Sequence, residues 1–117
     1  MMNDIPDRYR HDLLIIRETT EQILLDLNIS DFKIVFSGNE NDAFGELKTQ
    51  LIPVIEKLFK EDGSSFRQML YRVDIDEKEY KKALSEKESA GFEEAISELI
   101  IRREFQKVLT RKYFSKK

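Results

Sequence analysis

The apolar positions of the first quarter of the chain repeat with the spacing of an α-helix. Between Ile5 and Leu27 they fall within about a 100° arc when projected at ~100° per residue. The residues on this arc are Ile5, Tyr9, Leu13, Ile16, Ile23, Leu24 and Leu27. Asn3 or Asp4 would cap the helix, with Pro6 in its first turn, where a missing N–H costs nothing. The pattern predicts one helix from this cap to about Leu27, with a core-facing stripe. Leu14 and Leu25 on its far side are either a second, weaker contact line or exposed.

The next segment has the composition of a strand. Asp31 to Gly38 is rich in β-branched and aromatic residues and ends at a Ser-Gly pair, which is typical of a short strand. A strand needs a partner, and the best one within the chain is Tyr71 to Ile75, where apolar and polar residues alternate. That pairing would give an α+β fold with a two-stranded element. Without it, Phe32 to Phe36 is an extended connector, or an edge that pairs between two copies of the chain.

The region before Ile75 fits a helix as well as a strand. Its apolar residues follow the spacing i, i+3, i+4, i+7 and are Phe66, Met69, Leu70 and Val73. Periodicity alone does not separate the two possibilities. Ser64 or Ser65 would cap a helix here, which favours a helix ending near Val73.

Further helices are predicted on either side of this region. One begins near Asn41 or Asp42, is kinked or restarted at Pro53, and ends with Gly63 as its C-cap. Its buried face comprises Phe44, Leu47, Leu51, Val54, Ile55 and Leu58. A short helix begins at Asp76, with Glu79 completing a capping box. Its buried residues are Tyr80, Ala83 and Leu84, and a polar connector from Ser85 to Gly91 follows.

The last helix, from Phe92 towards Phe114, changes its apolar face midway. In its first half the apolar side chains lie on one side and are Phe92, Ala95, Ile96, Leu99 and Ile100. In its second half they lie nearly opposite and are Ile101, Phe105, Val108 and Leu109. Arg103, Lys107 and Arg111 occupy the line that the first stripe would have followed. The second half is therefore expected to pack against a different neighbour.

These elements predict a mostly α, compact helical domain of about four to five helices with at most one short strand. The chain has 117 residues, which is close to the commonest size of one domain, so residues 1–117 are expected to form a single domain. Hydrophobic residues make up 40% of the sequence and charged residues 37%. Eight Phe and four Tyr argue against disorder and for a packed core under a charged surface.

Two interpretations of the final helix concern a partner. In the first, Ile101, Phe105, Val108 and Leu109 dock on a protein partner or on a second copy, which makes a homodimer. In the second, a basic row contacts nucleic acid or another polyanion; it comprises Arg103, Lys107, Arg111 and Lys112. From Arg102 onward seven Lys or Arg accompany one acidic residue, although the whole chain has a net charge of −3. The plainest interpretation of these cations is that they suit the negative end of the helix dipole.

No catalytic or metal-binding motif emerges, so we expect neither enzymatic activity, nor a cofactor, nor a metal. The absence of Cys excludes disulfides, thiolate zinc sites and a cysteine nucleophile. His11 is the only histidine and has Asp7 four residues before it, but a surface histidine explains it better than a metal ligand. Phosphate-binding glycine loops and nucleophile elbows are missing as well. Glu94 and Glu98 are interpreted as solvated helix surface.

Targeting signals are not apparent either. The first ten residues include Asp4, Asp7 and Arg8 where a signal peptide needs an apolar run, and the longest apolar run, Leu13 to Ile16, is far short of the ~20 residues of a membrane span. A cytoplasmic location without membrane contact is the default expectation. The leading functional hypothesis is a non-enzymatic protein–protein interaction module, which binds a partner or itself. The alternative is a nucleic-acid-associated protein.

Overall fold

The computed structural model describes residues 12–29, 32–85 and 91–113. This part of the chain forms five α-helices and no strand. They are α2 (Leu13–Asp26), α3 (Ala43–Glu61), α4 (Gly63–Val73), α5 (Glu77–Ser85) and α7 (Phe92–Tyr113). The predicted mostly α fold of four to five helices is confirmed.

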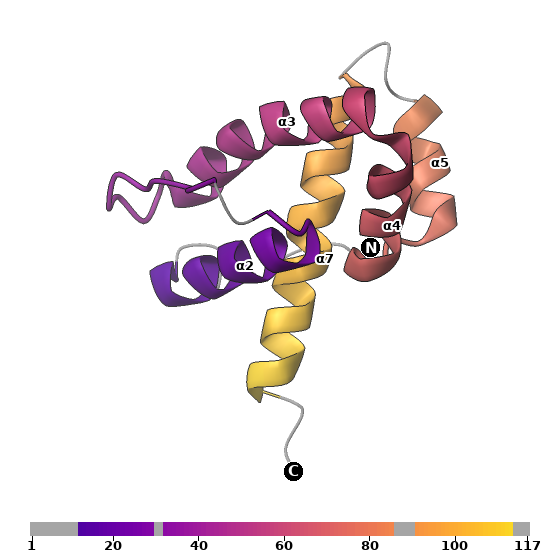
Figure 1. The fold of residues 1–117 in the computed structure, drawn as a ribbon. Coiled ribbons are helices and arrows are strands. Elements are labelled where there is room, and N and C mark those ends of the chain that lie inside the picture. Colours follow the sequence, from indigo (N-terminus) through magenta and orange to yellow (C-terminus); the bar gives the residue numbers. More distant parts are fainter. Residues whose placement is uncertain (1–11, 30–31, 86–90, 114–117) are drawn as a thin grey trace.

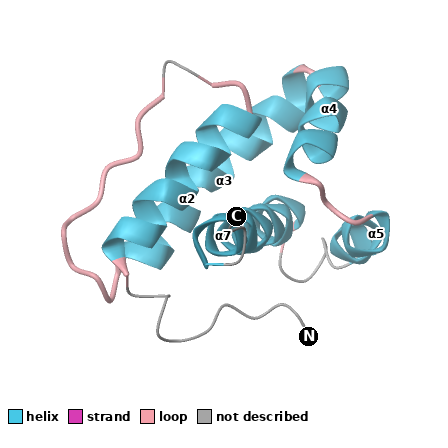
Figure 2. Ribbon diagram, turned by 90° about the horizontal axis from the view of Figure 1, so that it is seen from below, coloured by secondary structure: helices cyan, strands magenta, loops and turns pink. Residues whose placement is uncertain are grey.

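The longest helix, α7, is the axis of the fold. It packs against α2, α3, α4 and α5, and Figure 1 shows α2 and α3 crossing it while α4 and α5 lie together at one end of α3. Figure 2 looks almost along α7, with α2 and α3 on one side of it and α5 on another. The result is a compact body measuring 35 × 31 × 29 Å. No helix within the described residues has the length and apolar character that crossing a bilayer requires.

The start of α2 differs from the prediction. Asp12 has the extended backbone angles φ −87° and ψ 103°, and its Oδ1 accepts hydrogen bonds from the N–H groups of Leu14 at 3.1 Å and Ile15 at 3.2 Å. A carboxylate that accepts the free N–H groups of a first turn is a strong N-cap. The prediction of one unbroken helix from Asn3 or Asp4 is therefore wrong, because Asp12 starts a helix of its own. Residues 1–11 lie outside the described part.

The junction between α3 and α4 also corrects an expectation. Gly63, expected as the C-cap of the preceding helix, is the first residue of α4. Asp62 ends α3 and caps α4, accepting hydrogen bonds from the Ser65 N–H at 3.1 Å and the Ser65 hydroxyl at 2.7 Å. One aspartate thus takes the capping role that Ser64 or Ser65 was expected to fill. Pro53 lies inside α3 and does not end it.

The structure shows that the Tyr71–Ile75 segment begins as the last turn of a helix and is not a strand. α4 continues to Val73, and Asp74 ends it in the left-handed region with φ 71°. The residues that bury are Phe66, Met69 and Val73, as the i, i+3, i+7 spacing predicts. The α+β alternative therefore has no counterpart in the described chain.

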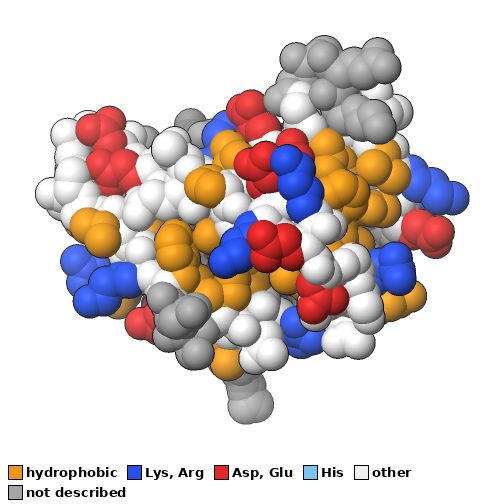
Figure 3. Space-filling model, turned by 45° about the horizontal axis from the view of Figure 1, so that its top comes forward, with side chains coloured by type: hydrophobic (Ala, Val, Ile, Leu, Met, Phe, Trp, Pro, Cys, Tyr) orange, Lys and Arg blue, Asp and Glu red, His pale blue; other side chains and the backbone are white. Residues whose placement is uncertain are grey.

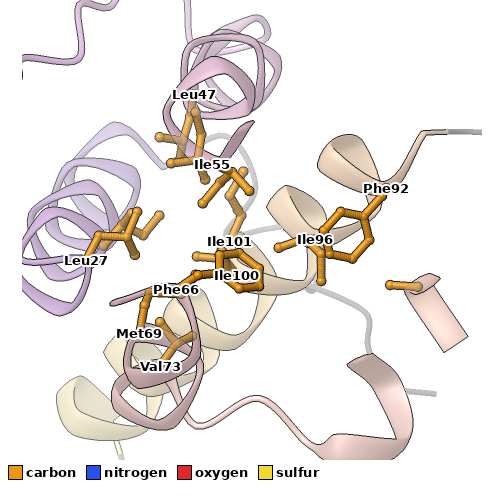
Figure 4. Close-up of a cluster of buried hydrophobic side chains, with 13 residues drawn as sticks. Leu27, Leu47, Ile55, Phe66, Met69, Val73, Phe92, Ile96, Ile100 and Ile101 are labelled. Carbon is orange, nitrogen blue, oxygen red and sulfur yellow. The ribbon is translucent and has the colours of Figure 1, made fainter. Parts of the chain in front are cut away.

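Two clusters of buried side chains meet along α7. The larger, shown in Figure 4, gathers Ile96, Ile100 and Ile101 of α7 with apolar residues of the four other helices, among them Phe66 and Leu27. The second lies between α7, the first half of α2 and the start of α3. Its buried members are Ile15, Ile16, Ala43, Phe105, Val108 and Leu109. Because α7 is buried on opposite sides in its two halves, the rotation of its apolar stripe is explained by the fold.

Candidate functional site

The second apolar stripe of α7 lies inside the chain's own core. Ile101, Phe105 and Val108 are almost fully buried, and Leu109 is buried too. The Phe105 ring packs against Phe44, with the ring centroids 6.2 Å apart. The different neighbour that the sequence predicted is α2 of the same chain, so these side chains offer no exposed face to a partner. The cause is simple, because α2, about ninety residues earlier in the sequence, covers this stripe.

The basic row of α7 is also engaged within the chain. Arg103 Nη2 lies 2.7 Å from Asp74 Oδ2, and Lys112 Nζ lies 3.2 Å from Glu18 Oε2. Arg111 donates a hydrogen bond of 3.1 Å to the side-chain oxygen of Gln22. The row therefore binds α7 to α2 and to Asp74 at the end of α4. A polyanion at this row would have to compete with these acceptors.

The fourth member of the row, Lys107, is the centre of a partly buried charged cluster. Its Nζ lies 2.9 Å from Asp26 Oδ2 and 3.0 Å from Glu104 Oε1. It also donates hydrogen bonds to the carbonyl oxygens of Arg72 at 3.2 Å and Val73 at 3.3 Å. One ammonium group thus joins α2, α7 and the C-terminal end of α4. We call Asp26, Glu104 and Lys107 the charged cluster.

Glu104 is the unusual member of the charged cluster. Its side chain is fully buried, and neither carboxyl oxygen accepts a hydrogen bond of good geometry. Burial, followed by the hydrogen bond to the Asp26 carboxyl, raises the pKa of Glu104 to about 8, against the opposing effect of Lys107. At neutral pH Glu104 is therefore a protonated carboxyl that donates to Asp26. A neutral acid avoids the cost of a second buried negative charge.

The other two members of the charged cluster remain charged. Burial acts to raise the pKa of Asp26, but hydrogen bonds from Glu104 and Lys107 outweigh it and lower the pKa. Burial acts to lower the pKa of Lys107, but Asp26 and Glu104 outweigh it and raise the pKa. The cluster consequently holds one negative charge, one positive charge and one proton, with no net charge. These charges hold three helices together. They do not form a site for a metal cation, because the Lys107 ammonium already occupies the space between the carboxyl groups.

A Glu104→Gln variant tests whether Glu104 carries a proton in the folded chain. The ordinary pKa of this carboxyl is 4.5 and the folded value is about 8, so between these pH values only the folded chain holds the proton and the free energy of unfolding falls as pH rises. Glutamine cannot ionise, so we expect the variant to lose this decline and to exceed the wild type by about 2–3 kcal/mol at pH 8.5. Urea unfolding between pH 4.5 and 9 measures it, with Glu98→Gln on the same helix as the control. A decline that persists unchanged in Glu104→Gln would show that it does not come from a proton on Glu104.

A second candidate site is the extended segment of residues 32–36. Its side chains alternate, with Phe32, Ile34 and Phe36 half-buried and Lys33 and Val35 exposed. The side-chain amide of Gln50 binds both backbone groups of Val35: Oε1 accepts from its N–H at 2.9 Å and Nε2 donates to its C=O at 2.8 Å. The N–H and C=O of one residue point the same way only in an extended chain. Gln50 thus takes the place of a neighbouring strand.

A shallow groove lies between this segment and α2. Its volume is about 820 Å³. The residues that line it are Arg17, Thr20, Glu21, Leu24, Phe32, Lys33, Ile34, Val35 and Phe36. Ile34 and Phe36 also pack against the core, whereas Phe32 belongs to neither buried cluster. The groove therefore combines apolar side chains with a backbone that runs along its margin, and we call it the α2 groove.

The other residues that the sequence singled out form no site within the described part of the chain. His11 and Asp7 lie outside the described residues. Glu94 and Glu98 are exposed and lie 3.1 and 3.3 Å from Lys48 Nζ, as solvated helix surface would. Among the residues with a described position, no group of three His, Cys, Asp or Glu side chains is placed to hold a metal ion.

Sequence reasoning missed the charged cluster and the role of Gln50. The first left a signal, because Glu104 is the only acidic residue in the basic end of α7 and lies three residues after Ile101 and four before Val108, on the buried side. The second left none, because any exposed glutamine has the same appearance in a sequence. A scan against protein-family models, a search of curated proteins and a search of solved structures each found no match.

Proposed function

We propose that the protein is a non-enzymatic binding module that recognises a polypeptide at the α2 groove. The observation that carries this proposal is the backbone edge of residues 32–36. Val35 is bonded to Gln50, but among the described residues no hydrogen bond reaches the backbone N–H or C=O of Ile34 or Phe36. Unpaired groups in an extended segment are a template for another extended chain.

The side chains beside this edge support the same role. Phe32 and Leu24 are half-buried in the groove, and Val35 is 64% exposed. Apolar and aromatic groups of this kind supply binding energy to a partner, while the backbone supplies direction. Arg17, Lys33 and Glu21 place charges of both signs around them. A polypeptide provides apolar, charged and backbone groups together, which a small metabolite does not.

The nucleic-acid alternative has less support. Each member of its basic row is bonded to α2, to Asp74 or within the charged cluster. Figure 3 shows the face around α3, where hydrophobic patches are separated by charged side chains of both signs. A phosphate backbone is bound by a field of unpaired cations, and this face does not present one.

A pair of aromatic substitutions tests the proposal. Phe32→Ser removes an aromatic ring from the groove, and Tyr71→Ser removes one that is 85% exposed on α4. Tagged proteins are crosslinked in native extract, treated with nuclease and captured. We expect a polypeptide that the wild type and Tyr71→Ser retain, and that Phe32→Ser retains at about a tenfold lower level.

The fold of each variant is checked by thermal unfolding. Phe32 packs in neither buried cluster, so its loss is expected to cost about 1 kcal/mol or less. Equal recovery by all three proteins, or recovery that nuclease abolishes, would overturn the proposal.

A further inference from the structure

The hydrogen bonds of residues 35 and 37 fix the direction of the extended segment. The N–H of Val35 binds Gln50, and the N–H of Ser37 binds Glu46 Oε1 at 3.1 Å. Both acceptors belong to α3, so the odd-numbered residues turn their backbone groups towards that helix. In an extended chain the backbone groups of alternate residues point to opposite edges. Those of the even-numbered residues therefore point away from α3.

The α2 groove lies on the side of the segment that faces away from α3. Among the described residues, four of α2 line it and none of α3 does. Phe36 packs against both buried clusters, whereas Ile34 packs only against the larger one, which holds the buried side chain from the second half of α2. The segment therefore runs back along α2, and Figure 2 shows the connection from α2 to α3 following the outside of these helices. An extended chain in the groove would have α2 on one side and the unpaired backbone groups of Ile34 and Phe36 on the other.

Two cations at the rim of the α2 groove are unpaired. Arg17 on α2 and Lys33 on the segment are exposed, and neither side chain forms a salt bridge or a hydrogen bond with any described residue. Arg103 and Lys112, which line two other shallow pockets, are each held in a salt bridge. The α2 groove thus keeps its cations available to an external anion.

Glu21 is the third charged side chain at the rim. It follows Arg17 by four residues, on the same face of α2, yet no ion pair joins the two within the described chain. Arg17 and Lys33 against Glu21 give the rim a net charge of +1. The floor is apolar, with Leu24 and Phe32 half-buried in it. A groove with this floor and this rim fits a chain that is apolar on one face and acidic on the other.

We propose that the polypeptide bound at the α2 groove is an extended segment in which acidic and apolar side chains alternate. This inference rests on the proposed function and names the class of its partner. Successive side chains of an extended chain point to opposite faces, so the apolar ones enter the floor while the acidic ones stay at the rim beside Arg17 and Lys33. The partner's backbone exchanges hydrogen bonds with Ile34 and Phe36. Burial in the floor provides affinity, and the charge of the rim provides selectivity.

Three short fluorescein-labelled peptides test the charge preference. In each peptide Leu occupies every second position, and the positions between are all Glu, all Ser or all Lys. Fluorescence anisotropy with the full chain measures the dissociation constants. We expect the Glu peptide to bind about tenfold more tightly than the Ser peptide, and the Lys peptide to bind most weakly. Because the rim is exposed, the preference should shrink as the salt concentration rises.

Charge substitutions at the rim act in opposite directions. Arg17→Glu/Lys33→Glu is expected to reverse the order, so that the Lys peptide binds most tightly. Glu21→Gln removes the rim carboxylate and should strengthen binding of the Glu peptide about threefold. The matched control is Lys57→Glu/Lys78→Glu, which reverses two exposed cations outside the groove and should leave the order unchanged. Thermal unfolding checks that each variant is folded.

Amide hydrogen exchange locates the bound peptide. Adding the Glu peptide should slow exchange of the Ile34 and Phe36 amides, which have no partner among the described residues. The Val35 amide, already bonded to Gln50, should stay constant. Slower exchange elsewhere, with none at Ile34 and Phe36, would overturn the binding mode.

The remaining outcomes separate this inference from the proposed function. Equal affinity for the three peptides, or an unchanged order in Arg17→Glu/Lys33→Glu, would overturn the acidic class of partner. If no peptide binds while Phe32→Ser still loses a captured polypeptide, the alternating acidic segment is wrong and the proposed function stands. Oligothymidine that binds the groove more tightly than the Glu peptide would identify nucleic acid as the occupant and overturn both. Equal capture by the wild type and Phe32→Ser would also overturn both.

Discussion

Replacing Lys107 with methionine is expected to lower the free energy of unfolding at pH 7 by about 3–5 kcal/mol. Methionine keeps much of the side-chain length and removes the charge, so Asp26 is left as a buried carboxylate beside Glu104 without its counter-ion. The carbonyl oxygens of Arg72 and Val73 lose a donor as well. Urea unfolding followed by circular dichroism measures the change.

Lys48 provides a closely matched control. Its side chain is 24% exposed and that of Lys107 is 23% exposed, and each lysine lies between two carboxyl groups. The carboxylates around Lys48, those of Glu94 and Glu98, are 48% and 43% exposed, so water replaces the lost ammonium. We expect Lys48→Met to cost less than about 1 kcal/mol. Equal losses from the two substitutions would show that the burial of the partners does not set the strength of the charged cluster.

The charged cluster also shows why the ion pairs that hold the helices together could not be predicted from the sequence. Lys107 binds Asp26 from 81 positions away, Arg103 binds Asp74 from 29, and Lys112 binds Glu18 from 94. In the sequence these cations form a basic end attached to an acidic body, which suggests an external polyanion. In the fold the acidic body is the partner. Local spacing predicts which face of a helix is charged, but not which distant helix meets it.

The individual helices were easier to predict from the sequence than the contacts between them. The spacing of Phe66, Met69 and Val73 fitted α4, although the expected serine cap was needed to favour a helix over a strand. The change of stripe in α7 predicted that its halves meet different neighbours. Errors arose where two residues competed for one capping role: Asn3 and Asp12 are both good N-caps, and Gly63 next to Asp62 looked like a helix end. Capping depends on where the tertiary structure ends each helix, and a sequence does not show this.

The extended segment of residues 32–36 shows the same difference between local features and long-range contacts. The β-branched and aromatic composition of Asp31 to Gly38 indicated a strand or an extended connector, because composition is a local property. The partner of its backbone was a single side chain, Gln50, fifteen positions away. Sequence patterns predict strands that pair with strands, and they have no signature for a helix side chain that replaces one. The open edge on the far side, which carries the proposed function, became visible only with that contact.

Phe105→Ala is expected to cost about 3–5 kcal/mol of unfolding free energy. Phe105 is 1% exposed at the centre of the second cluster, with Phe44 against its ring, so truncation leaves a cavity between α2 and α7 that the long helices cannot close. The matched surface variant is Leu25→Ala on α2, which removes an exposed side chain and should cost about 0.5 kcal/mol or less. Thermal and urea unfolding measure both.

The same variant decides between the two interpretations of the rotated stripe. As a core residue, Phe105 should lower stability when truncated without changing the mass of the folded chain or its self-association in sedimentation velocity. As an interface residue, it should change the mass and leave the stability of the monomer within about 0.5 kcal/mol. The first result is expected, because α2 already covers the ring. It would leave the open edge of residues 32–36, rather than α7, as the surface through which the chain meets a partner.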